Sequence, residues 1–211
     1  MKKQRKTTHQ AFYHEHPINT GLDRTPCDKR ILNSTERVAQ NTLKEHSRIL
    51  ACPFVVKFPD DYIPDDNEEV KTAMARTVKE CQRGKPSHKP TYVLVKERSR
   101  DGGIHYHGML FLDNSVVRSP VGTLKKLERN LERAVGIEGR NGTNNQGLVE
   151  LCNTGKDGKK QKWLYIIHRG NKEEFDDMFY RASYMAKLKD KDDNGRELFC
   201  SKTMKSQGDQ S

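Results

Sequence analysis

Two alternating apolar runs flank a glycine-rich turn, and this pattern constrains the fold more than any other stretch. The runs, Thr91–Glu97 and Ile104–Leu112, are rich in β-branched, aromatic and aliphatic residues. Between them, Asp101-Gly102-Gly103 supplies the backbone freedom that a tight connection needs. The sequence therefore predicts a β-hairpin, and a hairpin fixes which side chains share one face of a sheet.

The rest of the chain alternates between predicted helices and strands. Helical spacing and capping signals predict helices at about 34–46, 67–82, 121–135 and 172–188. Short apolar runs predict further strands at 48–58, 148–152, 163–168 and 197–200. Pro53, inside the first of these strands, indicates a sheet edge or a bulge. Consecutive hairpins with helices between them indicate an α+β domain with a mainly antiparallel sheet.

The two ends of the chain are more polar than its middle. We expect a loose N-terminal arm at 1–33 and a polar tail at 202–211, because neither holds a strong apolar run. Residues 34–201 then form one domain, since 211 residues fit one domain with extensions better than two. The cations Lys2, Lys3 and Arg5 of the arm either contact duplex DNA or simply solvate the segment.

Charge and cysteine content restrict the class of protein. The formal net charge of +10 favours a polyanionic partner such as nucleic acid, although a basic soluble surface also gives this charge. The five cysteines form no CxxC pair, so we expect free thiols in a reducing cytoplasm rather than disulfides or a zinc ribbon. The chain shows no signal peptide and no apolar stretch near the ~18 residues of a membrane span. We therefore expect a cytoplasmic protein with no membrane partner.

The hairpin carries a candidate metal site. His105 and His107 point to one face, about 6.5–7 Å apart along the strand, while Tyr106 points to the other. If the turn centres near Asp101, Glu97 lies opposite His105 on the adjacent strand. Two imidazoles and one carboxylate suit Mg²⁺ or Mn²⁺, and such an ion can polarise a phosphodiester.

A tyrosine and a lysine further along the chain add a candidate nucleophile. Tyr184 and Lys187 are three positions apart, so they share one face of the predicted helix. Tyrosine is a weak nucleophile near neutral pH and needs activation. Lys187 can favour the phenolate or bind the phosphate that is attacked.

Each of these patterns has a simpler interpretation. An H-x-H pair also arises by chance in strands, and a carboxylate before a turn is often only solvated. His168, at the end of another predicted strand, is an alternative third ligand, although a lone histidine there is more often structural or exposed. Tyr180 is a second candidate nucleophile, but a helical aromatic residue more often packs in a core.

A basic turn at 156–162 precedes Trp163 and Tyr165. These residues can form a stacking and phosphate-binding surface for unpaired bases. Alternatively the turn is a solvated loop and Trp163 packs in the core, which is the interpretation that we favour for Trp163.

Four segments together resemble the HUH endonucleases, where a bulky hydrophobic residue separates two histidines. More narrowly, they resemble the replication endonucleases of the inovirus gene-II-like (YagK/YfjJ-type) family. Val95–Glu97 before Ile104–His107 resembles that family's acidic residue and H-Y-H hairpin, and Arg48–Pro59 resembles its early strand. Arg181–Lys187 is similar to its R-A-S-Y-L-A-K segment, the most specific match. Arg196, Phe199 and Ser201 resemble its closing R-x-F-G-x-S stretch, with Cys200 in place of glycine.

The resemblance covers about Arg48–Ser201 and implies a fold, an activity and a set of site residues. It implies an HUH endonuclease-like central antiparallel sheet with flanking helices. It implies Tyr184 as the nucleophile, His105 and His107 as metal ligands, and Glu97 as the third ligand. The implied activity is initiation of rolling-circle replication, by nicking and rejoining single-stranded DNA at an origin through a 5′-phosphotyrosine intermediate.

The implied partners are single-stranded DNA or an origin hairpin, with a separate helicase and polymerase. A separate helicase is expected because the sequence holds no G-x-x-x-x-G-K-[ST] nucleotide-binding loop. Such systems belong to phages and mobile elements in the bacterial cytoplasm. Two alternatives stay open: a non-catalytic DNA-binding regulator of phage or satellite replication on the same fold, and a metal-dependent hydrolase that uses activated water.

Overall fold

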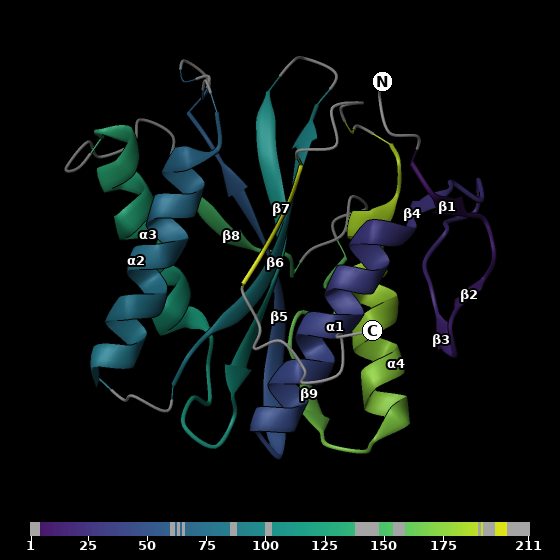
Figure 1. The fold of residues 1–211 in the computed structure, drawn as a ribbon. Helices are drawn as coiled ribbons and strands as arrows, with labels where there is room; N and C mark the ends of the chain where they lie inside the picture. The colour runs from purple at the N-terminus through teal and green to yellow at the C-terminus, as the bar shows by residue number, and fades with distance from the viewer. Residues whose placement is uncertain are drawn as a thin grey trace, which may run out of the picture.

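A six-stranded antiparallel sheet stands between two pairs of helices (Figure 1). The computed structural model describes residues 5–59, 62, 64, 66–84, 88–99, 103–137, 148–153, 159–189, 191 and 197–201. The helices are α1 (Lys29–Glu45), α2 (Glu68–Gly84), α3 (Val121–Val135), α4 (Lys172–Ala182) and the short 3₁₀ helix η1 (Ser183–Ala186). The sheet strands are β5 (Arg48–Lys57), β6 (Thr91–Arg98), β7 (Ile104–Asp113), β8 (Val149–Leu151), β9 (Tyr165–His168) and β10 (Leu198–Cys200). The predicted α+β class is confirmed.

Several residues that the sequence analysis singled out lie outside the described residues. They are Lys2, Lys3, Asp101, Gly102, Lys156, Arg196 and the tail 202–211.

The order of strands across the sheet is β10-β6-β7-β5, and β8 and β9 share the outer edge of β5. The predicted hairpin is confirmed as β6 and β7, but β8 and β9 pair with successive parts of β5 rather than with each other. Pro53 therefore lies inside the sheet and not at an edge. Its carbonyl accepts a hydrogen bond from the Cys152 N–H at 3.1 Å, so its nitrogen faces the same side, between the β8 and β9 pairings. Because neither β8 nor β9 pairs with Pro53 itself, the missing N–H of proline removes no hydrogen bond between strands.

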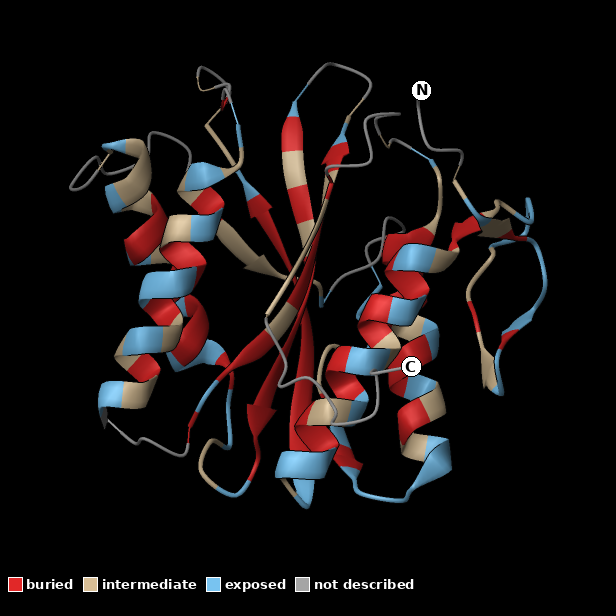
Figure 2. Ribbon diagram, viewed as in Figure 1, coloured by how far each residue is buried: buried red, intermediate tan, exposed pale blue. Residues whose placement is uncertain are grey.

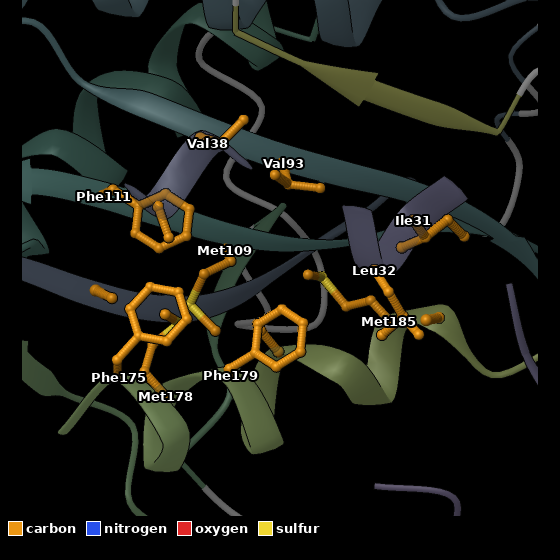
Figure 3. Packing of buried hydrophobic residues seen from close by; sticks show 14 of the residues in the cluster. Ile31, Leu32, Val38, Val93, Met109, Phe111, Phe175, Met178, Phe179 and Met185 are labelled. Atoms are coloured by element: carbon orange, nitrogen blue, oxygen red, sulfur yellow. The ribbon is translucent and has the colours of Figure 1, made fainter. Parts of the chain in front are cut away.

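Each face of the sheet packs on one helix pair, as the alternation along the hairpin requires. Helices α1 and α4 cover one face, where Val93, Met109 and Phe111 pack with Phe175 and Phe179 (Figure 3). Helices α2 and α3 cover the other face, where the buried residues include Leu94, Tyr106, Leu110, Met74 and Leu127. The buried stripes of both helix pairs face the sheet (Figure 2). As predicted, Tyr106 therefore points away from the histidines, and its hydroxyl donates to Asn67 Oδ1 at 2.6 Å.

The N-terminal segment 5–28 packs on the domain through four very short strands. These are β1 (Thr7–Thr8), β2 (Phe12–Tyr13), β3 (His16–Pro17) and β4 (Cys27–Asp28), paired as β1 with β4 and β2 with β3. Tyr13, Ile18 and Cys27 are buried in the core cluster that also contains side chains of α1 and α4. The loose arm expected at 1–33 is therefore wrong from residue 5 onward. Few apolar side chains suffice here because the segment adds to an existing core instead of forming its own.

Two helix boundaries differ from the expected ones. Helix α1 begins at Lys29 rather than 34, because Asp28 caps it by accepting a hydrogen bond from the Arg30 N–H at 2.8 Å. Thr35, expected near the helix start, lies inside it, and its hydroxyl donates to the Ile31 carbonyl. Helix α4 ends at Ala182 and continues as η1, whereas a helix to 188 was expected.

All five cysteines are free thiols, as predicted. Across the described parts of the chain, the helices are too short or too polar to cross a membrane.

Candidate metal centre and tyrosine site

Three predicted ligands meet near the turn end of the β6–β7 hairpin. Glu97 pairs with His105 across the ladder, which is the predicted register. Glu97 Oε2 lies 3.6 Å from His105 Nε2 and 3.4 Å from His107 Nε2. One ligand atom from each residue lies within 4.8 Å of the others, so this group could hold one metal ion.

The protonation of two of these side chains suits metal binding. Burial lowers the pKa of His107 to about 4, although the Glu97 charge opposes the shift. The imidazole is therefore neutral at pH 7 and keeps a lone pair for a cation. Burial raises the pKa of Glu97, but the hydrogen bond from His105 and the charge of Lys191 outweigh it and hold that pKa below its usual range. An ionised carboxylate beside a neutral imidazole is a donor set that fits a divalent ion.

Lys191 is a buried member of the site that sequence analysis missed. Its Nζ donates to Glu97 Oε1 at 2.7 Å and also to the carbonyl of Lys187. The Lys191 side chain is only 1% exposed. In the sequence it belongs to a run of charged residues after Lys187, and nothing there separates it from a solvated lysine.

The tyrosine motif lies over the same sheet face. The ring centroids of Tyr184 and His107 are 6.0 Å apart in an edge-on arrangement. Lys187 Nζ lies 5.0 Å from the centroid of the Tyr184 ring. The structure thus brings the predicted nucleophile, its lysine and the three ligands together. The local structure differs from the expected α-helix, because Tyr184 is in η1 and Lys187 follows that helix with extended backbone.

Tyr180 does not join this group. It lies on α4 with 46% of its surface exposed. Among the described residues, no ring contact or ion pair connects its side chain to the three ligands. The change from α-helix to 3₁₀ helix after Ala182 breaks the regular spacing that would put Tyr180 and Tyr184 on one face.

The N-terminal segment holds the tyrosine motif in place. Cys27 forms an antiparallel bridge with Lys187, and the N–H of Leu188 donates to the carbonyl of Pro26 at 2.9 Å. The N–H of Asn19 donates to Ser183 Oγ at 2.8 Å. Sequence analysis missed this role, because the N-terminal segment makes these contacts with its backbone groups, which leave no pattern of side chains.

Gly21 and Asp23 of this segment lie beside the Lys187 amine. Gly21 has φ +75°, and a Cβ there would lie 2.8 Å from both Lys187 Nζ and Asp23 Oδ1. Burial lowers the pKa of Lys187, and the carboxylate of Asp23 opposes that shift. The left-handed backbone therefore favours glycine at this position, and a Cβ there would push the ends of the Lys187 and Asp23 side chains aside.

His168 is not part of the metal centre. It pairs with Arg48 at one end of β5, whereas His105 pairs with Lys57 at the other end. Nine residues of extended strand separate these ends, which is roughly 30 Å. The His168 side chain is about half exposed and pairs with Glu174 at 3.0 Å. Glu97 is therefore the third member of the group.

A second concave region lies at the start of β9. It is an open cleft of about 430 Å³ lined by Asn153, Lys160, Gln161, Lys162, Trp163 and Leu164. Trp163 is only partly buried and belongs to neither core cluster, so the favoured core packing of this residue is wrong. The reason is that β9 begins at Tyr165, so Trp163 lies before the strand and outside the sheet.

Comparison with known proteins identifies the family. The sequence profile of the YagK/YfjJ C-terminal domain matches residues 8–201. Neither a curated protein nor a solved structure matches the chain. The matched range includes all five residues of the metal and tyrosine group and most of the N-terminal segment that packs on it. The chain belongs to the YagK/YfjJ C-terminal domain family.

Proposed function

We propose that this protein is an HUH-type initiator that nicks and rejoins single-stranded DNA at a replication origin. The observation that carries the proposal is the position of the Tyr184 ring, 6.0 Å from His107. Both lie on the sheet face that also presents Glu97 and His105. A candidate nucleophile beside a candidate metal site is the arrangement that phosphodiester transfer needs.

We further propose that the metal ion is Mg²⁺ or Mn²⁺, held by Glu97, His105 and His107. Two imidazole nitrogens and an ionised carboxylate are compatible with either ion and leave positions for water and phosphate oxygens. When bound, such an ion polarises a phosphodiester oxygen and stabilises charge on the attacked phosphate. Lys191 holds Glu97 from its other side and so fixes the carboxylate toward the histidines.

In the proposed reaction, the Tyr184 hydroxyl oxygen attacks the scissile phosphorus. A bond forms between that oxygen and phosphorus, and the bond from phosphorus to the 3′ oxygen breaks. The phenol proton leaves, and the released 3′ oxygen gains a proton to become a hydroxyl that a polymerase can extend. Lys187, whose ammonium lies near the ring face, favours the phenolate. Attack by a later 3′-hydroxyl reverses the bond exchange and releases the protein.

The DNA partner is single-stranded DNA or an origin hairpin in the bacterial cytoplasm, with strand separation by a separate helicase. The net charge of +10 supports attraction to phosphate. The cleft with Lys160, Lys162 and Trp163 offers cations beside a partly exposed aromatic ring, which is the combination that binds unpaired bases.

The test is a covalent adduct assay with a single-stranded oligonucleotide that carries the origin and Mn²⁺. The wild-type protein should form an adduct, Tyr184→Phe should lose it, and the control Tyr180→Phe should keep most of it. Replacing His105 and His107 with alanine should abolish cleavage but leave much of the salt-sensitive DNA binding. A binding regulator would shift DNA without any adduct, and a hydrolase that uses water would cut DNA without one, so either result refutes the proposal.

A further inference from the structure

Arg181 is a partly buried cation that has no counter-charge among the residues that the structure describes. It lies on α4, three residues before Tyr184, and its Nε is buried without a hydrogen-bond acceptor. Within the described part of the chain, the guanidinium makes no hydrogen bond and no ion pair. Removing a cation from water without a partner is unfavourable, so such a residue indicates a ligand that supplies the missing anion.

The surroundings of Arg181 place that ligand beside the tyrosine. A small cavity of about 20 Å³ is lined by Arg181, Tyr184, His107 and Cys152, with apolar walls from β5, β7 and η1. The volume suffices for about one water molecule or one oxygen atom of a ligand. None of the described residues that line it is a carboxylate.

The electrostatics of the cavity favour an anion. Burial raises the pKa of the Cys152 thiol, and the charge of Arg181 opposes this rise. Glu97 of the metal site is already paired with Lys191, and Asp177, one turn before Arg181 on α4, is paired with Lys162. An anion that enters the cavity therefore meets an unneutralised positive charge.

We propose that Arg181 binds the phosphate of the DNA strand and holds it against Tyr184. The planar guanidinium presents several N–H donors to phosphate oxygens, and the cavity beside it accommodates one such oxygen. This inference rests on the proposed function, because it takes the ligand to be a phosphodiester. It adds a third cation to the site, separate from Lys187, which lies over the ring, and from Lys191, which holds Glu97.

The first experiment requires no nicking activity. Spectra of ¹⁵N-labelled full-length protein show arginine Nε–H resonances, and Arg181→Lys identifies the Arg181 resonance by its absence. Inorganic phosphate should shift this resonance in a saturable manner, whereas chloride at equal ionic strength should not. The control Lys172→Met, which removes a cation elsewhere on α4, should respond like the wild type. An Arg181 resonance that responds equally to phosphate and chloride overturns the inference.

The second experiment uses the adduct assay with Mn²⁺. Arg181→Met should slow adduct formation about 100-fold, the effect expected when one donor to a transferring group is lost. Arg181→Lys should recover part of the rate, and Mn²⁺ affinity should be unchanged in both variants. A wild-type rate in folded Arg181→Met overturns the inference. If the wild type forms no adduct while phosphate still shifts the Arg181 resonance, the proposed function fails and the anion site stands.

Discussion

Glu97 Oε1 accepts a hydrogen bond from Lys191 Nζ at 2.7 Å, while its second oxygen faces the imidazoles of His105 and His107. One carboxylate thus connects a buried cation to the candidate metal ligands. Both partners of this ion pair are shielded from water, since the Lys191 side chain is 1% exposed and that of Glu97 is 8% exposed. We therefore expect the pair to affect both the stability of the fold and the binding of a metal ion at the candidate site.

We predict that Lys191→Met destabilises the protein in EDTA by about 3–5 kcal/mol, because it leaves the Glu97 charge buried without a partner. Urea unfolding measures the change. Added Mn²⁺ should recover part of the loss, since the ion supplies a counter-charge only in the folded state. The control Lys189→Met removes an exposed lysine nearby and should change stability by less than about 0.5 kcal/mol. Equal stability of Lys191→Met and wild type in EDTA would contradict the structure.

A second prediction concerns Gly21, where a Cβ would touch the Lys187 amine. Gly21→Ala should cost about 1–2 kcal/mol for its left-handed backbone and should also displace Lys187 and slow adduct formation. The matched control is Gly136→Ala, which has φ +73° but open space around the new Cβ. Gly136→Ala should lose similar stability and keep the wild-type adduct rate. Equal adduct rates in the two variants would show that the position of Lys187 does not matter.

A third prediction concerns stability in acid. Burial raises the pKa of Asp113, but hydrogen bonds from the hydroxyl and N–H of Ser115 outweigh it and lower the pKa. Because the folded pKa is below the unfolded value of about 3.9, this contribution is present above that value and is lost as pH falls through the folded pKa. Asp113→Asn should therefore lower the free energy of unfolding at pH 7. The variant should also lose less stability than the wild type as the pH falls below about 4. Urea unfolding between pH 5 and pH 2 measures this difference. If Asp113→Asn and the wild type lose the same free energy of unfolding over that range, Asp113 does not contribute to acid stability in this way.

A fourth prediction uses the single tryptophan of the chain. Because Trp163 lines the open cleft, single-stranded DNA should change its fluorescence in EDTA, with an affinity that falls as salt rises. Lys160→Ala should weaken this binding without changing the fluorescence of the free protein. Constant emission at DNA concentrations that give a complete gel shift would exclude the cleft as a contact surface.

The hairpin and the three candidate metal ligands that it carries were predictable from local sequence. Alternation of apolar residues fixes which side chains share a face, and a short turn fixes the register. These two rules place Glu97 opposite His105, and the structure has this pairing. The bounds of α3, Val121–Val135, also follow directly from helical spacing.

The parts that escaped prediction depend on contacts between distant segments. The segment around Pro26 and Cys27 joins the tyrosine motif by backbone pairing, which any residue can make. Lys191 is buried only because Glu97 is already there to receive it. The partial exposure of Trp163 depends on which residue begins β9. A run of apolar residues in the sequence does not specify where the strand starts.

Tyr184 is the residue that we propose becomes joined to DNA. Mass spectrometry of a trypsin-digested adduct tests it directly, because cleavage after Arg181 and Lys187 releases Ala182–Lys187 with Tyr184 as its only tyrosine. We expect a nucleotide 5′-phosphate on Tyr184, formed with Mn²⁺ and absent in EDTA. The same mass on the preceding peptide, which contains Tyr180, or cut DNA with no modified peptide, would contradict it.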